Sequence, residues 1–193
     1  KWIANVMREN EGKARYLGGG EESYGFLAED FVRDKDSVSA ISLMAEIAAW
    51  AKDKGLNMTD MLIDIYMKYG FSREKGISLV RKGISLMKQF RENPPKEIAG
   101  SPVVTVKDFQ SLVETNVATG ETKKLDMPAT SNVLQYYTAD RTKVSVRPSG
   151  TEPKIKFYIE VHDTLASADE YKATEARADE KINRIAKEFG ITK

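Results

Sequence analysis

The hydrophobic pattern changes along the chain, and this change constrains the fold more than any other feature. Before Gly70 the apolar residues recur mainly at helical spacing, whereas from Pro102 many of them alternate with polar residues, as in β-strands. The pattern predicts a largely helical N-terminal part and a C-terminal α+β domain with an antiparallel sheet. We expect the boundary near residues 70 to 75.

The first predicted helix begins with the chain itself. Its apolar residues start at Trp2 without a capping residue or an initiating Met, and it ends near Gly12. A short strand is predicted to follow over residues 14–17. The uncapped start leads us to expect that the chain is part of a longer polypeptide.

Two further helices are predicted before the boundary. One starts behind Asp36, which can cap it, and stops around Gly55. The other begins at Asn57 or Thr59 and ends at Gly70. We expect this last helix to turn one apolar side inward, formed by Met61, Leu62, Ile65, Tyr66 and Tyr69.

The C-terminal part shows strand and helix patterns. Strands are predicted over residues 77–80, 103–106, 133–137, 143–146 and 154–161. A short helix over residues 84–90 must end before Pro94 and Pro95, because proline cannot donate a backbone hydrogen bond. An amphipathic helix is predicted over residues 166–189.

The composition excludes several classes of function. The 193 residues include 30 Lys and Arg against 29 Asp and Glu, so no bulk field attracts nucleic acid or an anionic membrane. The absence of Cys excludes disulfides and thiolate chemistry, and fits a reducing compartment such as the cytoplasm. The single His162 excludes a multi-histidine metal site. No apolar run approaches the ~18 residues that a membrane span needs.

The loop from Arg147 to Lys154 is the strongest candidate for an anion site. Arg147 offers a planar fork of donors, Ser149 and Thr151 offer hydroxyls, and Gly150 allows backbone amides to gather around an anion. Lys154 and Lys156 should share one face of the following strand. The residue types alone also fit a plain hairpin turn, since Gly and Pro dominate turns.

A second candidate is the glycine-rich segment before Tyr24. Gly18, Gly19 and Gly20 allow close backbone approach, and the carboxylates at Glu21 and Glu22 could accept hydrogen bonds from sugar hydroxyls. The spacing matches neither a dinucleotide fingerprint nor a P-loop. A solvated turn at a helix start remains the alternative.

Three acidic or imidazole groups have simpler interpretations. Asp34 and Asp36 resemble half of a metal site, but the intervening Lys35 and the helix that follows favour capping. His162 follows the last predicted strand beside Asp163, where a structural role is more common than a catalytic one.

Together, the two loops resemble the α-D-phosphohexomutase superfamily of phosphoglucomutases and phosphomannomutases. The resemblance covers most of the chain and is carried by Gly20-Glu21-Glu22-Ser23, Arg33-Asp34-Lys35-Asp36, Asn93-Pro94-Pro95 and Arg147-Pro148-Ser149-Gly150-Thr151-Glu152-Pro153-Lys154. The form Glu-Glu-Ser-Tyr-Gly is closest to the phosphoglucomutase branch that includes phosphopentomutases.

The resemblance implies the fold and the roles of individual residues. Residues 1–72 would be the end of a third, α/β domain, and residues 73–193 a fourth domain with an antiparallel sheet packed on helices. The sugar would be bound by Glu21, Ser23 and Lys35. The phosphate that is not transferred would be held by Arg147, Ser149, Gly150 and Thr151.

The resemblance also implies an activity that this chain cannot perform alone. The family interconverts hexose 1-phosphate and 6-phosphate through a phosphoserine, Mg²⁺ and a 1,6-bisphosphate such as glucose 1,6-bisphosphate. Neither the serine loop nor the Asp-rich Mg²⁺ loop occurs in the sequence, so we expect an inactive part of a mutase that needs N-terminal domains. A phosphopentomutase and a non-catalytic phosphosugar-binding module remain alternatives.

Overall fold

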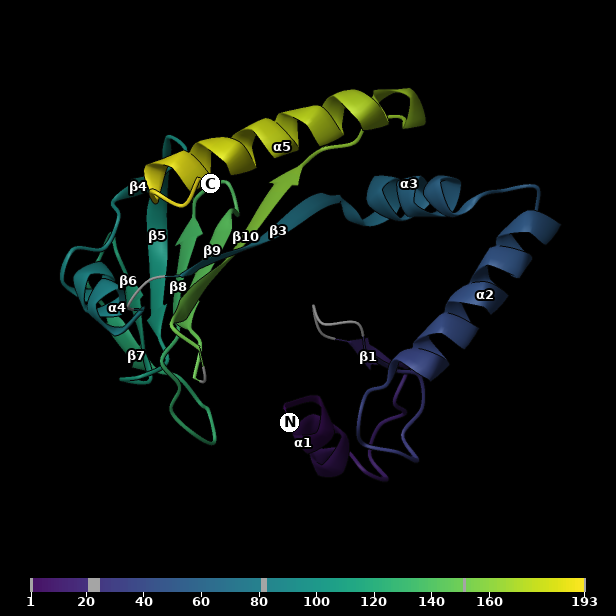
Figure 1. Cartoon of the computed structure of the whole chain (residues 1–193), viewed down its shortest axis with the longest axis horizontal. Coiled ribbons are helices and arrows are strands. Elements are labelled where there is room, and N and C mark those ends of the chain that lie inside the picture. Colours follow the sequence, from purple (N-terminus) through teal and green to yellow (C-terminus); the bar gives the residue numbers. More distant parts are fainter. Residues whose placement is uncertain (1, 21–24, 81–82, 151, 193) are drawn as a thin grey trace. The chain divides into compact units, whose positions relative to one another are not determined.

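The chain divides into two compact units in the computed structural model (Figure 1). The structure describes residues 2–20, 25–80, 83–150 and 152–192. Unit 1 is Lys1–Ile63 and unit 2 is Asp64–Lys193. The α3 helix crosses from one unit into the other. The boundary expected from the family resemblance, between residues 72 and 73, stays a prediction.

Unit 1 is mainly helical, as the sequence predicts. Its helices and strands are α1 (Trp2–Glu9), β1 (Gly19–Gly20), β2 (Phe26–Leu27), α2 (Ser37–Asp53) and the start of α3 (Met58–Tyr69). The predicted cap of α2 is confirmed, because Asp36 Oδ1 accepts a hydrogen bond from the Ser39 amide at 2.7 Å. Asn57 caps α3 by accepting from the amides of Thr59 and Asp60 at 2.8 and 3.0 Å.

Two expectations for the N-terminal part are wrong. Residues 14–17 are not a strand, because a strand needs a hydrogen-bonded neighbour, and in the described part of unit 1 the ladder pairs only Gly19–Gly20 with Phe26–Leu27. The α3 helix also does not bury its apolar side. Ile65 is 50% exposed and Tyr69 is 74% exposed. The helical spacing therefore predicted the helix correctly, but it did not predict whether other residues pack against its apolar side.

Unit 2 contains an antiparallel sheet and two helices. Its strands are β3 (Phe71–Val80), β4 (Glu97–Ile98), β5 (Ser101–Asp108), β6 (Val113–Asn116), β7 (Thr122–Lys124), β8 (Leu134–Thr138), β9 (Lys143–Pro148) and β10 (Lys154–Asp163). The strand order is β3-β10-β9-β8-β5-β6-β7, with β4 paired to β5. The predicted strands are confirmed, whereas β4, β6 and β7 were missed because they are short and polar or lie at turns.

The helices of unit 2 are α4 (Gly83–Glu92) and α5 (Tyr171–Glu188), the latter preceded by a 3₁₀ turn (Ala168–Glu170). Both predicted helices are thereby confirmed. Along β10 the odd-numbered residues from Ile155 to Val161 are buried and the even-numbered ones are partly exposed. The buried face packs against α5, whose own buried face includes Ala178, Ile182 and Ile185.

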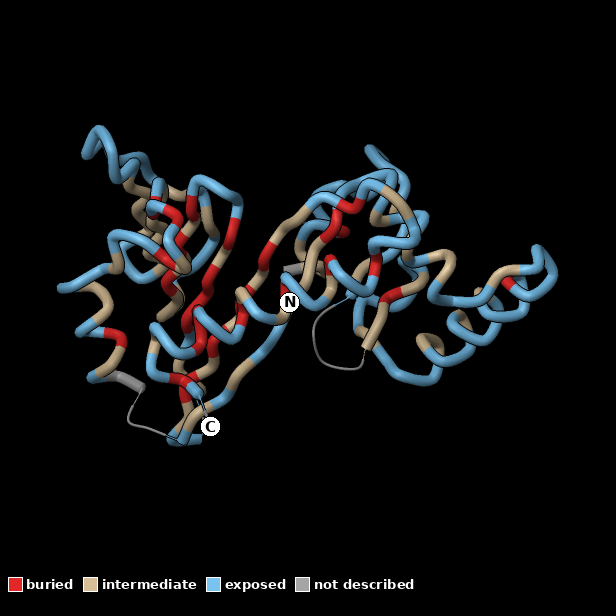
Figure 2. The backbone as a smooth tube through the Cα atoms, turned by 90° about the horizontal axis from the view of Figure 1, so that it is seen from above, coloured by how far each residue is buried: buried red, intermediate tan, exposed pale blue. Residues whose placement is uncertain are grey.

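The core of unit 2 lies between this face of the sheet and the helices (Figure 2). Tyr136, Phe157 and Ile155 are fully buried, and burial of each such side chain stabilises the fold by about 1.5–3 kcal/mol. Phe157 packs edge-on against Phe90 of α4, with ring centroids 6.0 Å apart. The opposite face of the sheet is polar, and the loop that the sequence singled out joins the end of β9 to the start of β10.

Candidate functional site

The loop between β9 and β10 is closed by backbone hydrogen bonds. The Ser149 amide donates to the Lys154 carbonyl at 2.8 Å, and the Lys154 amide donates to the Glu152 carbonyl at 2.7 Å. The Glu152 amide donates to Ser149 Oγ at 3.3 Å. The predicted hairpin is therefore confirmed, and its tip is a compact turn. Thr151, a predicted phosphate ligand, lies outside the described residues.

One of the two lysines after the loop is already paired. Lys154 Nζ lies 2.9 Å from Glu152 Oε1. The hydrogen bond from Lys154, together with its charge, holds the pKa of Glu152 below its ordinary value. The Lys154 ammonium thus closes the loop on itself, and its charge is largely cancelled there.

Arg147 and Lys156 form a different pair. They are cross-strand partners in the β9–β10 ladder, and directly opposed residues of an antiparallel pair project from the same face of the sheet. This face is the polar one, because Lys156 alternates with the buried Ile155 and Phe157. Within the described residues, neither side chain forms a hydrogen bond or a close ion pair, although the charge of Lys156 is the smallest of the contributions that lower the pKa of Glu152. Two adjacent positive charges are thus left open to an anion.

Gly150 has no structural reason to be glycine within the described residues. Its φ is not positive, so the backbone does not require glycine there. A Cβ atom added to Gly150 would meet nothing within 4 Å. The gathering of amides around an anion at Gly150 stays a prediction, because Thr151 lies outside the described residues, and the space beside Gly150 is open.

His162 takes part in an ion-pair cluster on the polar face. Its Nε2 lies 3.0 Å from Glu160 Oε1, not against the neighbouring Asp163, which pairs with Arg177 at 3.1 Å. Glu160 is also paired with Lys143. Burial raises the pKa of Glu160 and the hydrogen bond from Lys143 lowers it, and the net shift is downward. The cluster braces strands β9 and β10.

The glycine-rich segment of unit 1 forms a hairpin. Gly19 pairs with Leu27 and Gly20 with Phe26, so β1 and β2 enclose residues 21–25. Glu21 and Ser23, the predicted sugar ligands, lie outside the described residues. Lys35 is described and is half-buried.

Gly18 and the two glycines of β1 make room for neighbouring side chains. A Cβ atom on Gly18 would come within 2.9 Å of Phe26 Cζ, and one on Gly20 within 3.0 Å of Phe26 Cδ2. A Cβ atom on Gly19 would lie 2.8 Å from Tyr16 Oη, and that hydroxyl donates to the Leu27 carbonyl at 3.1 Å. The close backbone approach expected from the sequence is therefore internal packing.

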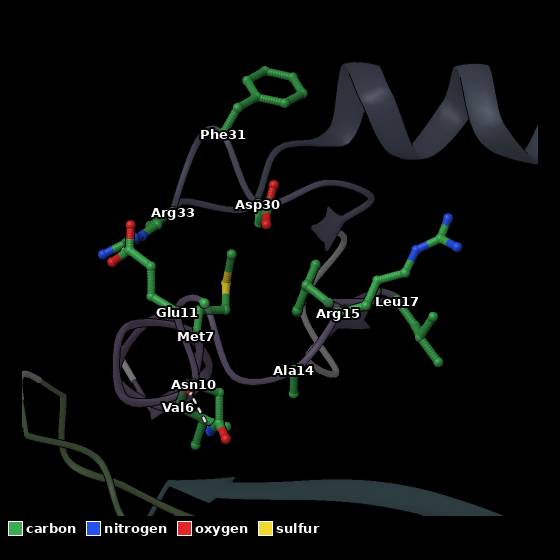
Figure 3. Close-up of a pocket in the computed structure, with 13 residues that line it drawn as sticks. Val6, Met7, Asn10, Glu11, Ala14, Arg15, Leu17, Asp30, Phe31 and Arg33 are labelled. Carbon is green, nitrogen blue, oxygen red and sulfur yellow. Dashed lines mark hydrogen bonds and ion pairs between the residues drawn. The ribbon is translucent and has the colours of Figure 1, made fainter.

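A cavity of about 790 Å³ lies elsewhere in unit 1 (Figure 3). Its lining mixes apolar side chains such as Met7 and Phe31 with charged ones. Arg33 closes part of it through an ion pair to Glu11 at 2.8 Å. Gly18 of the glycine-rich segment lines this cavity, whereas the described residues predicted to bind sugar or phosphate, Lys35, Arg147, Ser149 and Gly150, do not. The sequence analysis did not predict this cavity.

The described residues contain no group of three or more His, Asp or Glu side chains that could hold a metal ion. Asp36, which was considered with Asp34 for a metal half-site, is the N-cap of α2, as the sequence predicts. No helix of this part of the chain is long and apolar enough to cross a bilayer.

The fold and the loop define a mixed α/β protein with a candidate anion site at the end of an antiparallel sheet. Two family models match the sequence. The model of phosphoglucomutase/phosphomannomutase, alpha/beta/alpha domain III, matches residues 1–69, and that of the phosphoglucomutase/phosphomannomutase C-terminal domain matches residues 91–178. The chain belongs to the phosphoglucomutase/phosphomannomutase family, and it matches domain III and the C-terminal domain of that family. The expected fold class, α/β plus α+β, is confirmed.

Curated relatives agree with this assignment. The chain is 36% identical over 166 residues to the phosphoglucomutase of Staphylococcus epidermidis, a match that covers 82% of this chain and 30% of the relative. It is 34% identical over 169 residues to that of Staphylococcus haemolyticus, covering 84% and 30%. The match to the phosphoglucomutase of Staphylococcus aureus is 36% over 166 residues. The chain therefore spans about 30% of the length of these relatives.

A solved structure shares the fold. The open form of parafusin, the exocytosis-sensitive phosphoprotein (phosphoglucomutase) of Paramecium, superposes with a TM-score of 0.51 at 15% sequence identity. The superposition covers 96% of this chain and 33% of that one. This similarity supports the fold alone.

Proposed function

We propose that this chain is the substrate-binding C-terminal part of a phosphoglucomutase or phosphomannomutase. The whole protein would interconvert hexose 1-phosphate and 6-phosphate through a phosphoserine and a 1,6-bisphosphate intermediate. The observation that carries the proposal is the pair Arg147 and Lys156, opposed across β9 and β10 and without a partner among the described residues.

The phosphate would bind on the polar face beside the loop. Arg147 can donate two hydrogen bonds to phosphate oxygens, and Lys156 adds a second positive charge from the neighbouring strand. Ser149 and Thr151 would add hydroxyl donors, and the open side of Gly150 would admit the anion. We include Lys156 because it stands directly opposite Arg147 in the β9–β10 ladder. The alternation of buried and exposed residues along β10 already places Lys156 on the polar face.

The phosphate site can serve a substrate that binds in two orientations. A phosphate dianion presents much the same three oxygens whether it is attached to one end of the sugar or the other, so one clamp can hold either phosphate. The sugar hydroxyls would be read by Glu21, Ser23 and Lys35. Holding both ends positions the free hydroxyl for phosphoryl transfer, a reaction in which positioning and charge neutralisation supply most of the catalysis.

The groups that transfer the phosphoryl would come from the rest of the polypeptide. Mg²⁺ would neutralise charge on the transferred phosphoryl group, but the described residues hold no fitting ligand set. We therefore assign no Mg²⁺ ligand to this chain and expect no turnover from it alone. A 1,6-bisphosphate activator and a cytoplasmic location belong to the same proposal for the whole protein.

Two alternatives use the same site. A phosphopentomutase would bind a pentose phosphate at the same loops, and the Glu-Glu-Ser-Tyr-Gly form is compatible with it. A non-catalytic phosphosugar-binding module would need only the open pair Arg147 and Lys156. Turnover by the whole protein of hexose phosphate, of pentose phosphate or of neither separates the three.

Binding by the 193-residue chain is the first test. In a titration followed by amide NMR shifts, glucose 6-phosphate should move the signals of residues 149–156, whereas glucose without phosphate should not. The variants R147A and K156A should abolish the shifts. K124A is the matched control, because Lys124 is an exposed cation on β7 with the same charge. If K124A lost the amide shift changes as fully as R147A does, the binding would depend only on the net charge of the chain and not on this site.

Turnover by the whole protein is the second test. R147A should weaken substrate binding by about 2–4 kcal/mol, the range for losing a charge-assisted contact, and unchanged KM and kcat would contradict the assignment. E21Q should reduce turnover more than thermal stability. An equal loss of both would indicate a structural role for Glu21.

A further inference from the structure

The polar face of the sheet is built from rows of directly opposed residues. Strand β10 lies between β9 and β3, and its residue Lys156 pairs with Arg147 on one side and with Ser78 on the other. Directly opposed residues of antiparallel strands project from the same face of a sheet. Ser78, Lys156 and Arg147 therefore form one row across three strands, which we call the open row.

The nearest charges on either side of the open row are paired. Towards the loop, Lys154 lies 2.9 Å from Glu152. Towards the other end of β10, Lys143 forms an ion pair with Glu160. The row that separates this ion pair from the open row carries no charge at neutral pH and consists of Gly76, Tyr158 and Ser145. Among the described residues, an anion placed in the open row would therefore meet two positive charges that no carboxylate within ion-pair distance neutralises.

Ser78 is exposed and lies on an edge strand. In the part of the chain that the structure describes, β3 is the first strand in the sheet order and pairs only with β10. Another protein can bind the outer edge of such a strand through its backbone groups. Lys75, which is also exposed, precedes Ser78 by three residues, and charge patterns of this kind help kinases to select their substrates. The Ser78 hydroxyl is thus accessible to a modifying enzyme.

A phosphate attached to Ser78 would lie beside both cations of the open row. The Cβ atoms of directly opposed residues are about 5 Å apart, and a phosphoserine carries a charge of about −1.5 to −2 on three acceptor oxygens. Lys156 can therefore form a cross-strand ion pair with it. Arg147 stands two strand spacings from Ser78, about 10 Å, and its long side chain can reach across Lys156. Such a phosphate would take the place of the phosphate of a ligand.

We propose that Ser78 is a phosphorylation site, and that its phosphate fills the open row and excludes a phosphorylated ligand. A protein kinase would transfer the γ-phosphoryl group of a nucleoside triphosphate to Ser78 Oγ. A bond forms between Oγ and phosphorus, and the bond from phosphorus to the β,γ-bridging oxygen breaks. The nucleoside diphosphate leaves, and the hydroxyl proton passes to a base of the kinase. The inference rests on the proposed function for the ligand that is excluded, but not for the pairing of position 78 with Lys156.

Incorporation of phosphate is the first measurement. The 193-residue chain is incubated with MgATP and a serine kinase that selects a basic residue three positions before its acceptor. Tandem mass spectrometry should locate a phosphoryl group at Ser78. K75A should reduce the incorporation, because it removes the basic residue, and S78A should abolish it. An unmodified Ser78 after this incubation overturns the inference.

Closure of the site is measured with two anionic probes, inorganic phosphate and glucose 6-phosphate. Each is titrated into the unmodified and the phosphorylated chain, and binding is followed by amide NMR shifts. Phosphorylation should weaken the binding of both by about tenfold or more, because like charges placed side by side repel each other. S78E should weaken it in the same direction, whereas S78Q, which has the same size without the charge, should not. T122E is the matched control, because Thr122 is an exposed hydroxyl residue on β7, at the other end of the sheet order.

Thermal unfolding supplies a readout that needs no ligand. S78E should raise the melting temperature relative to S78Q when Lys156 is present, because opposite charges directly across a strand pair stabilise it. This gain should disappear in the K156A background. An equal difference between S78E and S78Q in both backgrounds would show that position 78 does not act on Lys156, and it overturns the inference.

The outcomes distinguish this inference from the proposed function. Weaker binding after phosphorylation, together with coupling between positions 78 and 156, supports the inference. Unchanged binding after phosphorylation overturns the closure of the site and leaves the proposed function standing. If the unmodified chain binds neither probe, the proposed function and the exclusion of a ligand are both contradicted, whereas the unfolding measurement still decides whether position 78 pairs with Lys156.

Discussion

The two units of the chain differ sharply in how they treat their apolar residues. In unit 2 the sheet and helices bury a continuous core, with Phe157, Ile159 and Val161 at most 1% exposed. In the described part of unit 1 only Met7, Leu27 and Ala51 are buried among the hydrophobic residues. Unit 2 therefore buries the apolar faces that its sequence pattern predicts, whereas the described part of unit 1 leaves most of its apolar residues exposed.

The α2 helix shows the difference most clearly. It is apolar on several sides, yet Val38 is 75% exposed, Ile41 is 70% exposed and Trp50 is 54% exposed. A helix that is hydrophobic all round is stable only when it is buried. Unit 2 thus buries enough apolar surface to fold as a unit. The exposed apolar side chains of α2 in unit 1 would need another surface packed against them.

The largest expected effect separates the units as isolated polypeptides. Residues 64–193 should give a single cooperative thermal transition and dispersed amide NMR signals, because the core lies entirely within them. Residues 1–63 should show no cooperative transition and should bind a hydrophobic dye. Cooperative unfolding of residues 1–63 alone would break the comparison.

The same substitution in each unit gives the next largest contrast. I159A removes a side chain that is 1% exposed in the core of unit 2 and should cost about 2–5 kcal/mol of unfolding free energy. I41A removes one that is 70% exposed on α2 and should change it by about 0.5 kcal/mol or less. Urea unfolding of the 193-residue chain measures both, and similar losses would show that α2 is already covered.

Acid should weaken unit 2 through Asp140. Lys181 lies 2.6 Å from Asp140 Oδ2, and Thr138 donates to Oδ1. Burial raises the pKa of Asp140 and these hydrogen bonds lower it, with a strong net decrease. A carboxyl with a lowered folded-state pKa stabilises the fold above its unfolded pKa of about 3.9, and this stabilisation is lost as the pH falls through the folded-state pKa.

The variant D140N isolates this contribution. It should lower the unfolding free energy by about 1 kcal/mol at pH 7, a modest value because the Asp140 side chain is 41% exposed. The difference from the unmodified chain should shrink between about pH 5 and pH 2. D126N is the control, since it removes the same charge from an exposed loop residue. A pH-independent difference would contradict the ion pair.

The smallest effect should come from the turn between β4 and β5. Ala99 and Gly100 connect these strands with φ of 50° and 80°, a two-residue hairpin that favours Asn-Gly. A99N should stabilise unit 2 by about 0.5 kcal/mol, because Asn tolerates the left-handed region better than Ala. Hydrogen exchange should show the gain in unit 2 only. A129N, in an exposed loop, should have no effect.

Periodic elements could be predicted because their signal lies in neighbouring residues. The alternation along residues 154–161 placed β10 and its buried face, and Asp36 marked the start of α2. The strand predicted over residues 14–17 was wrong because β-structure depends on a partner strand that local sequence does not specify. For the same reason the inward side of α3 could not be judged from its spacing.

The candidate site was predicted only in part. The sequence alone identified Arg147, its loop and the shared face of Lys154 and Lys156. The roles of Glu21, Ser23 and Thr151 stay predictions. The sequence did not show that Lys154 is paired with Glu152, or that Lys156 stands opposite Arg147.

The helices, most strands and the family follow from the amino-acid sequence alone, because these depend on local periodicity and on contiguous motifs. The tertiary structure decided which charges are cancelled and which stay open, since that depends on the register of β9 against β10. It also placed the Lys35 side chain so close to Gly25 that a Cβ atom there would lie 2.7 Å from Lys35 Cγ. Contacts between residues distant in sequence depend on how the backbone folds, and no local pattern encodes them.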